Sequence, residues 1–136
     1  MKKEREKLNV NVVAALIWQG DKFLACRRPT WKQHGGKWEF VGGKIEKGET
    51  KEDALVRECR EELAISVRPI AEFLWLEYEY PEMFVEMTVF LTEIVSGEPK
   101  RLDHDELRWV GVEEMAELDF SDADQLILKK IREIYL

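Results

Sequence analysis

The stretch from residue 42 to residue 65, GGKIEKGETKEDALVRECREELAI, constrains the fold of this chain more than any other part. From Lys51 onward, apolar residues recur at helical spacing at Leu55, Cys59 and Leu63, which predicts an amphipathic helix with one face in a core. Two glycines open the stretch and a third follows before the helix. The stretch therefore joins a glycine-rich loop to one helix, and the rest of the chain is expected to form the scaffold around it.

The face of this helix opposite the apolar residues carries three glutamates. Glu58, Glu61 and Glu62 stand at positions i, i+3 and i+4, so their carboxylates emerge within one turn. No Lys or Arg lies four residues beyond any of them, and two glutamates at that spacing cost an isolated helix about 0.2–0.5 kcal/mol. The alternative is an ordinary acidic surface helix. Clustered carboxylates are also what Mg²⁺ prefers, together with substrate phosphate oxygens, so the pattern favours a divalent-cation site.

The loop before the helix suits the same use. Gly42, Gly43 and Gly48 permit positive φ angles and a close approach of the backbone to a ligand, and Lys44 adds a cation where phosphate would lie. Thr50 is the expected N-cap, because its side chain can accept a hydrogen bond from the amide three residues on.

The spacing of residues across this stretch resembles the Nudix box, the signature of a superfamily of hydrolases that cleave nucleoside diphosphates linked to another moiety. The matching positions are Gly43, Glu49, Arg57, Glu58, Cys59, Glu61, Glu62 and Ile65. The flanking WEF of residues 38–40 and KIE of residues 44–46 resemble the MutT branch, which acts on nucleoside triphosphates. Two positions depart from the pattern. Val41 replaces a proline, and Ala64 replaces a glycine that lets the helix end turn left-handed, a conformation that costs alanine about 1 kcal/mol.

The resemblance implies a metal-dependent site. Glu58, Glu61, Glu62 and the carbonyl of Gly42 would bind Mg²⁺ or Mn²⁺, and Glu58 would act as the general base. The implied reaction is hydrolysis of a nucleoside triphosphate, with 8-oxo-dGTP and other modified or pyrimidine nucleotides as candidates, to a nucleoside monophosphate and pyrophosphate. A Nudix-fold sensor that binds nucleotides without cleaving them is the alternative, although such proteins commonly lose a glutamate of the box.

The same resemblance assigns Arg57 and Glu49 to the catalytic machinery as a pair that orients the helix against the loop. An i, i+4 contact between Arg57 and Glu61 is the alternative. In Nudix proteins a later loop often adds one more acid to the metal site. That loop spans residues 100–106 here, and Asp105 or Glu106 could be the acid.

Resemblance to MutT proteins also indicates substrate contacts. Arg28 would contact phosphate, with an exposed strand-end arginine as the alternative. Phe40 and Tyr80 are candidate stacking walls for the base, although an aromatic side chain in a strand is more often core. Asp124 would read the base edge and, as an ionised carboxylate, only accept hydrogen bonds; alternatively it completes a capping box with Ser121. The expected substrate-binding set is Arg28, Phe40, Gly43, Lys44, Tyr80 and Asp124.

Composition limits the possible partners and location. A chain of 136 residues with 45% apolar content predicts one domain over residues 1–136. The net charge of -7 argues against binding a nucleic acid polymer, and against hydrolysis at RNA 5′ ends, because such surfaces are basic. No apolar run reaches the roughly 18 residues of a membrane helix, and the N-terminal MKKEREKL does not resemble a signal peptide. We expect a cytoplasmic monomer or homodimer.

Alternating and β-branched apolar residues predict strands interleaved irregularly with helices. The expected strands cover residues 10–18, 23–28, 38–41, 65–80, 84–95 and 107–112, and a last helix follows Ser121. His34, in the loop of residues 29–37, is given no role. The pattern favours an α/β fold with a mixed β-sheet between helices, and the resemblance implies the Nudix α/β/α sandwich.

Overall fold

The computed structural model describes residues 7–136. All of MKKEREKL except its last two residues lies outside that range. The elements are β1 (Leu8–Gln19), β2 (Lys22–Arg27), β3 (Trp38–Glu39), β4 (Gly42–Lys44), α1 (Lys51–Leu63), β5 (Ser66–Glu79), β6 (Met83–Ser96), β7 (Glu106–Gly111), the 3₁₀ helix η2 (Val112–Glu117) and α2 (Asp122–Tyr135). Each strand expected from the sequence is present with small shifts at its ends, whereas β4 and η2 were not predicted.

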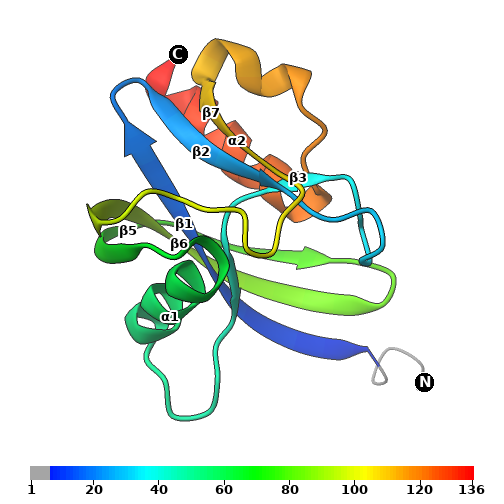
Figure 1. The fold of residues 1–136 in the computed structure, drawn as a ribbon. Coiled ribbons are helices and arrows are strands. Elements are labelled where there is room, and N and C mark those ends of the chain that lie inside the picture. The colour runs from blue at the N-terminus through cyan, green and yellow to red at the C-terminus, as the bar shows by residue number, and fades with distance from the viewer. Residues whose placement is uncertain (1–6) are drawn as a thin grey trace.

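Strand β1 is the centre of a mixed sheet. It runs parallel to β6 from the Leu8–Met83 pair to the Ile17–Thr92 pair, and it is antiparallel to β4 on its other edge. At its C-terminal end it turns into β2, which also pairs with β3 and β7, while β5 pairs with β6 on the far side. Helix α1 packs beside β1, β4 and β5, whereas β3 lies at the other edge of the sheet, next to β2 (Figure 1).

Both faces of this sheet are covered by a helix. On β1, Val13 and Ile17 belong to the core that contains the apolar face of α1, whereas the intervening Ala14 and Leu16 belong to the core that contains α2. Alternate side chains of one strand thus enter two separate cores. The helices lie on opposite sides of the sheet, which confirms the predicted α/β/α sandwich (Figure 1). No helix within residues 7–136 is both long and apolar enough to span a membrane.

The glycine-rich segment differs from its sequence interpretation. Gly42 and Gly43 lie in strand β4, paired with Ala14 and Val13, and of the three glycines only Gly48 has a positive φ, at 84°. Glycine is needed in β4 because the strand lies very close to its neighbours. A Cβ on Gly42 would stand 1.9 Å from the carbonyl oxygen of Val13. A Cβ on Gly43 would stand 2.4 Å from Oε2 of Glu58. The segment is therefore a strand edge on which a carboxylate of α1 rests.

Helix α1 begins and ends as the sequence indicates. Thr50 accepts a hydrogen bond of 3.0 Å from the amide of Asp53, and Ala64 is left-handed, with φ 58° and ψ 37°. Ala64 is exposed and its amide donates to the carbonyl of Arg60. The alanine therefore carries the strain that the family's glycine avoids.

Substituting Ala64→Gly is expected to raise the free energy of unfolding by up to about 1 kcal/mol, because glycine adopts the left-handed conformation without that strain. Turnover should stay within a few-fold of wild type, since no contact of the site is altered. Urea unfolding and steady-state kinetics measure the two effects. A large rise in turnover would contradict this expectation and show that Ala64 affects catalysis.

Candidate active site

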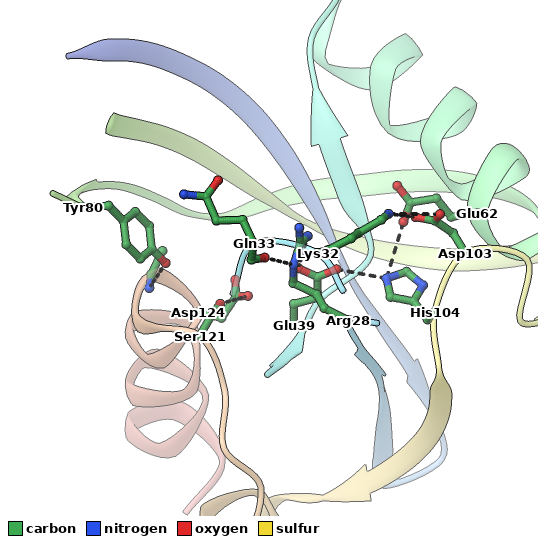
Figure 2. Close-up of polar contacts among 11 residues, drawn as sticks. Arg28, Lys32, Gln33, Glu39, Glu62, Tyr80, Asp103, His104, Ser121 and Asp124 are labelled. Atoms are coloured by element: carbon green, nitrogen blue, oxygen red, sulfur yellow. Dashed lines mark hydrogen bonds and ion pairs between the residues drawn. The ribbon is translucent and has the colours of Figure 1, made fainter. Parts of the chain in front are cut away.

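A cavity of about 620 Å³ lies between the C-terminal end of α1 and the N-terminal end of α2. This volume is typical of sites for small organic ligands. Its walls come from β1, β4, the end of α1, the loop after β2, the β5–β6 hairpin and the start of α2. Acidic residues lie at both sides: Glu62 and Asp103 toward α1, and Asp124 toward α2, with Arg28 and Glu39 between them (Figure 2).

Two of the three predicted glutamates come together. The side chains of Glu58 and Glu62 are only 13% and 16% exposed, and Glu58 contributes to the raised pKa of Glu62. Burial, followed by the hydrogen bond and charge of Glu58, raises the pKa of Glu62 well above its usual range. The raised pKa favours the protonated form of Glu62 unless a cation neutralises the charge there. Glu61 is different, because its side chain is 59% exposed and does not line the cavity, although it accepts a hydrogen bond from Arg57.

Arg57 forms both of the contacts that were considered alternatives. Its Nε and Nη2 donate to the two carboxylate oxygens of Glu49 at 2.7 and 3.0 Å, a bidentate ion pair. Its Nη1 donates to Glu58 and to Glu61 at 3.0 and 3.2 Å. Nη2 also donates to the carbonyl of Lys44 at 3.0 Å. These hydrogen bonds raise the pKa of Arg57 above its usual value and lower that of Glu49. The guanidinium thus joins α1 to the loop and to β4.

The acidic cluster has the donor chemistry of a divalent-cation site. Within residues 7–136 no three carboxylate, imidazole or thiol groups converge closely enough to hold one ion as they stand. However, burial and neighbouring negative charge raise the pKa of Glu62, and the missing side chain of Gly43 lets the carboxylate of Glu58 lie against β4, where any Cβ would clash with it. Oxygen donors of this kind fit Mg²⁺ or Mn²⁺. Glu58, Glu62, the nearby Glu61 and the backbone of Gly42 are the residues that would hold it.

Asp124 lies at the opposite side of the cavity and is buried, at 4% exposure. Its Oδ2 accepts a hydrogen bond of 2.7 Å from the hydroxyl of Ser121, whose backbone amide donates to Trp38 instead. The capping box proposed from the sequence therefore does not form. Burial, and then the charge of Glu39, raise the pKa of Asp124 to about 8. The side chain is consequently protonated at neutral pH and can donate a hydrogen bond, unlike the ionised acceptor expected from the sequence.

The two candidate stacking residues differ. Phe40 is 4% exposed and packs between Phe23 and Phe120, with ring centroids 5.3 and 5.6 Å away. Its position favours the core alternative, and it borders the cavity only through its small exposed part. Tyr80 lines the cavity beside Asp124, and its hydroxyl accepts a hydrogen bond of 2.9 Å from the amide of Ala123 (Figure 2). Tyr80 is thereby fixed to the start of α2.

The predicted phosphate contacts lie along the cavity. Arg28 lines it and donates from Nη1 to Glu39 at 3.2 Å and from Nε to the carbonyl of Gln33 at 3.0 Å. Gly43 and Lys44 of β4 line it as well. Lys32, which sequence reasoning missed, adds another cation, although its Nζ is paired with Asp103 at 2.9 Å (Figure 2).

The loop between β6 and β7 contributes acids other than those proposed. The side chain of Glu106 pairs with Arg27 and Arg108, at 3.7 and 3.2 Å, and Asp105 is exposed on a separate surface hollow. Neither lines the cavity described above, and the side chain of Glu106 faces the two arginines. Asp103 lines it instead, and His104 lies directly behind it. No local sequence pattern predicts that Asp103 and His104 belong to the site, because their partners are far away in the sequence.

The carboxylates on α1, the Arg57–Glu49 ion pair and the α/β/α sandwich all agree with the Nudix resemblance of the sequence. A NUDIX domain model matches residues 7–130, and the chain belongs to the Nudix hydrolase family. The chain is 32% identical over 116 residues to the 8-oxo-dGTP diphosphatase of Escherichia coli (strain K12), covering 85% of this chain and 90% of that protein. It is also 32% identical over 121 residues to the CTP pyrophosphohydrolase of the same strain, covering 88% and 89%. The crystal structure of the MutT protein from Methanosarcina mazei Go1 superposes with a TM-score of 0.82 at 27% identity, covering 96% of this chain and 99% of that one.

Proposed function

We propose that this protein hydrolyses nucleoside triphosphates to a nucleoside monophosphate and pyrophosphate, with Mg²⁺ or Mn²⁺ as cofactor. The observation that carries the proposal is a cavity lined by Glu62, the member of the carboxylate cluster that reaches it, at one side and by the buried Asp124 at the other. The span between them accommodates a nucleotide with its base toward α2 and its phosphates toward α1. The similarity to an 8-oxo-dGTP diphosphatase and to a CTP pyrophosphohydrolase supports this substrate class and leaves both purines and pyrimidines as candidates.

Each part of the site has a separate task in this proposal. A bound divalent cation would neutralise phosphate charge and lower the pKa of water. Glu58, Glu61 and Glu62 with the Gly42 carbonyl would hold the cation, and Glu58 would also accept the proton of the attacking water. Arg57 keeps Glu58 in place through its hydrogen bond of 3.0 Å. Arg28 and Lys44 contact phosphate oxygens, which orients the leaving group.

The mechanism predicts a strict dependence on metal. The purified protein should release pyrophosphate from at least one (d)NTP only with Mg²⁺ or Mn²⁺ present, because the acidic cluster cannot face a triphosphate without a cation. A panel of common and oxidised (d)NTPs that includes 8-oxo-dGTP and CTP, with pyrophosphate and orthophosphate assayed separately, tests this. Release of orthophosphate, or activity that survives a chelator, would contradict the proposed chemistry.

We further propose a cytoplasmic monomer or homodimer without a nucleic acid polymer as substrate. The formal charge of -7 supports this last point. The non-catalytic sensor is disfavoured because Glu58, Glu61 and Glu62 are all retained.

A further inference from the structure

His104 is a buried imidazole within the acidic part of the site. Its side chain is 2% exposed, and Nε2 lies 2.9 Å from Oε2 of Glu39 and 3.8 Å from Oε1 of Glu62 (Figure 2). Glu39 and Glu62 are themselves mostly buried, at 18% and 16% exposure. A nitrogen donor therefore stands between two carboxylates that would otherwise repel each other in a region shielded from water.

The backbone around His104 is tied to the elements that carry these carboxylates. The amide of Lys100 donates to the carbonyl of Leu63 at 2.9 Å, so the loop covers the C-terminal end of α1 next to Glu62. On the other side of His104, the amide of Asp105 donates at 2.9 Å to the carbonyl of Arg27, at the end of β2. The ring is thus placed by α1 and by the sheet together.

Glu39 extends the contact to the phosphate-binding side. Its Oε2 accepts from His104, and its Oε1 accepts from Nη1 of Arg28 at 3.2 Å. A continuous series of side chains, Arg28, Glu39, His104 and Glu62, therefore connects the predicted phosphate contact with the predicted cation ligand (Figure 2). Carboxylates that bind a metal usually depend on such outer partners for their orientation.

We propose that His104 is a positioning residue that holds Glu62, and through Glu39 also Arg28, in the arrangement used for metal and phosphate. This inference rests on the proposed function. The N–H donor at Nε2 is the essential feature. It donates a hydrogen bond to Glu39 at 2.9 Å and places its partial positive charge 3.8 Å from the carboxylate of Glu62. Within the described residues Nδ1 has no hydrogen-bond partner, so the ring acts through Nε2 alone.

The test compares His104→Gln, whose amide reaches the position of Nε2, with His104→Leu, which fills similar space without a donor. The Mn²⁺ dissociation constant is measured by electron paramagnetic resonance without nucleotide, and kcat and KM are measured separately. We expect His104→Leu to weaken Mn²⁺ binding about 10- to 100-fold and to lower kcat, whereas His104→Gln stays within a few-fold of wild type. His104→Asn, whose amide is too short to reach Glu39, should resemble the leucine variant and replaces it if that variant does not fold.

Arg101→Ala is the matched control, because Arg101 only donates to the carbonyl of Asp105 in the same loop, at 3.0 Å. It should leave Mn²⁺ affinity unchanged. Wild-type affinity in His104→Leu, equal losses in the Leu and Gln variants, or an equal loss in Arg101→Ala would each overturn the inference. If wild type releases pyrophosphate from no nucleotide, the proposed function fails, while the Mn²⁺ affinities still decide whether His104 positions Glu62.

Discussion

Replacing Glu62 with glutamine is expected to lower kcat by several orders of magnitude while leaving the protein folded. Glu62 is the member of the cluster that lines the cavity, so under the proposed mechanism its substitution would remove a cation ligand. Glutamine keeps the shape of the side chain. Steady-state kinetics at saturating Mg²⁺ and Mn²⁺ measure the effect, and Glu61→Gln should act in the same direction.

Glu52→Gln is the control for this substitution, because Glu52 is an exposed glutamate at the start of the same helix. Its turnover should equal that of wild type. Near-wild-type turnover of the Glu62 variant at saturating metal would reduce the cluster to a surface feature of the helix.

The same variant should change how stability depends on pH. The folded protein raises the pKa of Glu62, so it binds this proton more tightly than the unfolded chain does. The resulting stabilisation is complete below the unfolded pKa, near 4.5, and is lost as pH rises toward the folded value. In a chelating buffer, wild type should therefore lose stability from pH 5 upward more steeply than Glu62→Gln. Thermal unfolding of both proteins across this pH range gives the comparison.

Nucleotide preference should depend on pH in wild type and not in Asp124→Asn. With a pKa of about 8, the carboxyl group of Asp124 donates a hydrogen bond at pH 7 and only accepts at pH 9. An amide donates and accepts at both. A buried group left without its partner costs about 1–3 kcal/mol, so the ratio of kcat/KM between two bases should shift about tenfold in wild type.

The measurement is kcat/KM for both proteins on one nucleotide panel at pH 7 and pH 9. Titration of the base affects both proteins equally, so the difference between them isolates Asp124. A ranking that is the same in both proteins at both pH values would remove Asp124 from the base-binding site, and a stability change alone would leave it a structural residue.

The sequence was most informative where function depends on residues close together in the chain. Helical spacing placed Glu58 and Glu62 on one face of α1, and the cap at Thr50 and the left-handed end at Ala64 follow from rules that act within one turn. The run of residues 10–18, which is apolar on both faces, is likewise typical of a strand covered on both sides. The resemblance added the Arg57–Glu49 pair, which the structure contains.

The sequence was less informative about residues whose surroundings come from segments distant in the chain. The glycines of β4 were assigned to a flexible loop because their strand partner, β1, lies about thirty residues earlier. Asp105 and Glu106 were named as candidate acids of the loop, whereas Asp103 lines the cavity, because spacing within a loop does not reveal which side chain faces it.

The sequence by itself determined the acidic helix face and the mixture of strands and helices, because periodicity acts over a few residues, and its resemblance to the Nudix box added the α/β/α sandwich and the Arg57–Glu49 pair. Tertiary structure alone decided the protonation of Asp124 and the contact of His104 with Glu39, which lies 65 positions away. Burial and Coulomb interactions depend on every chain segment that surrounds a group, and those segments meet only after folding.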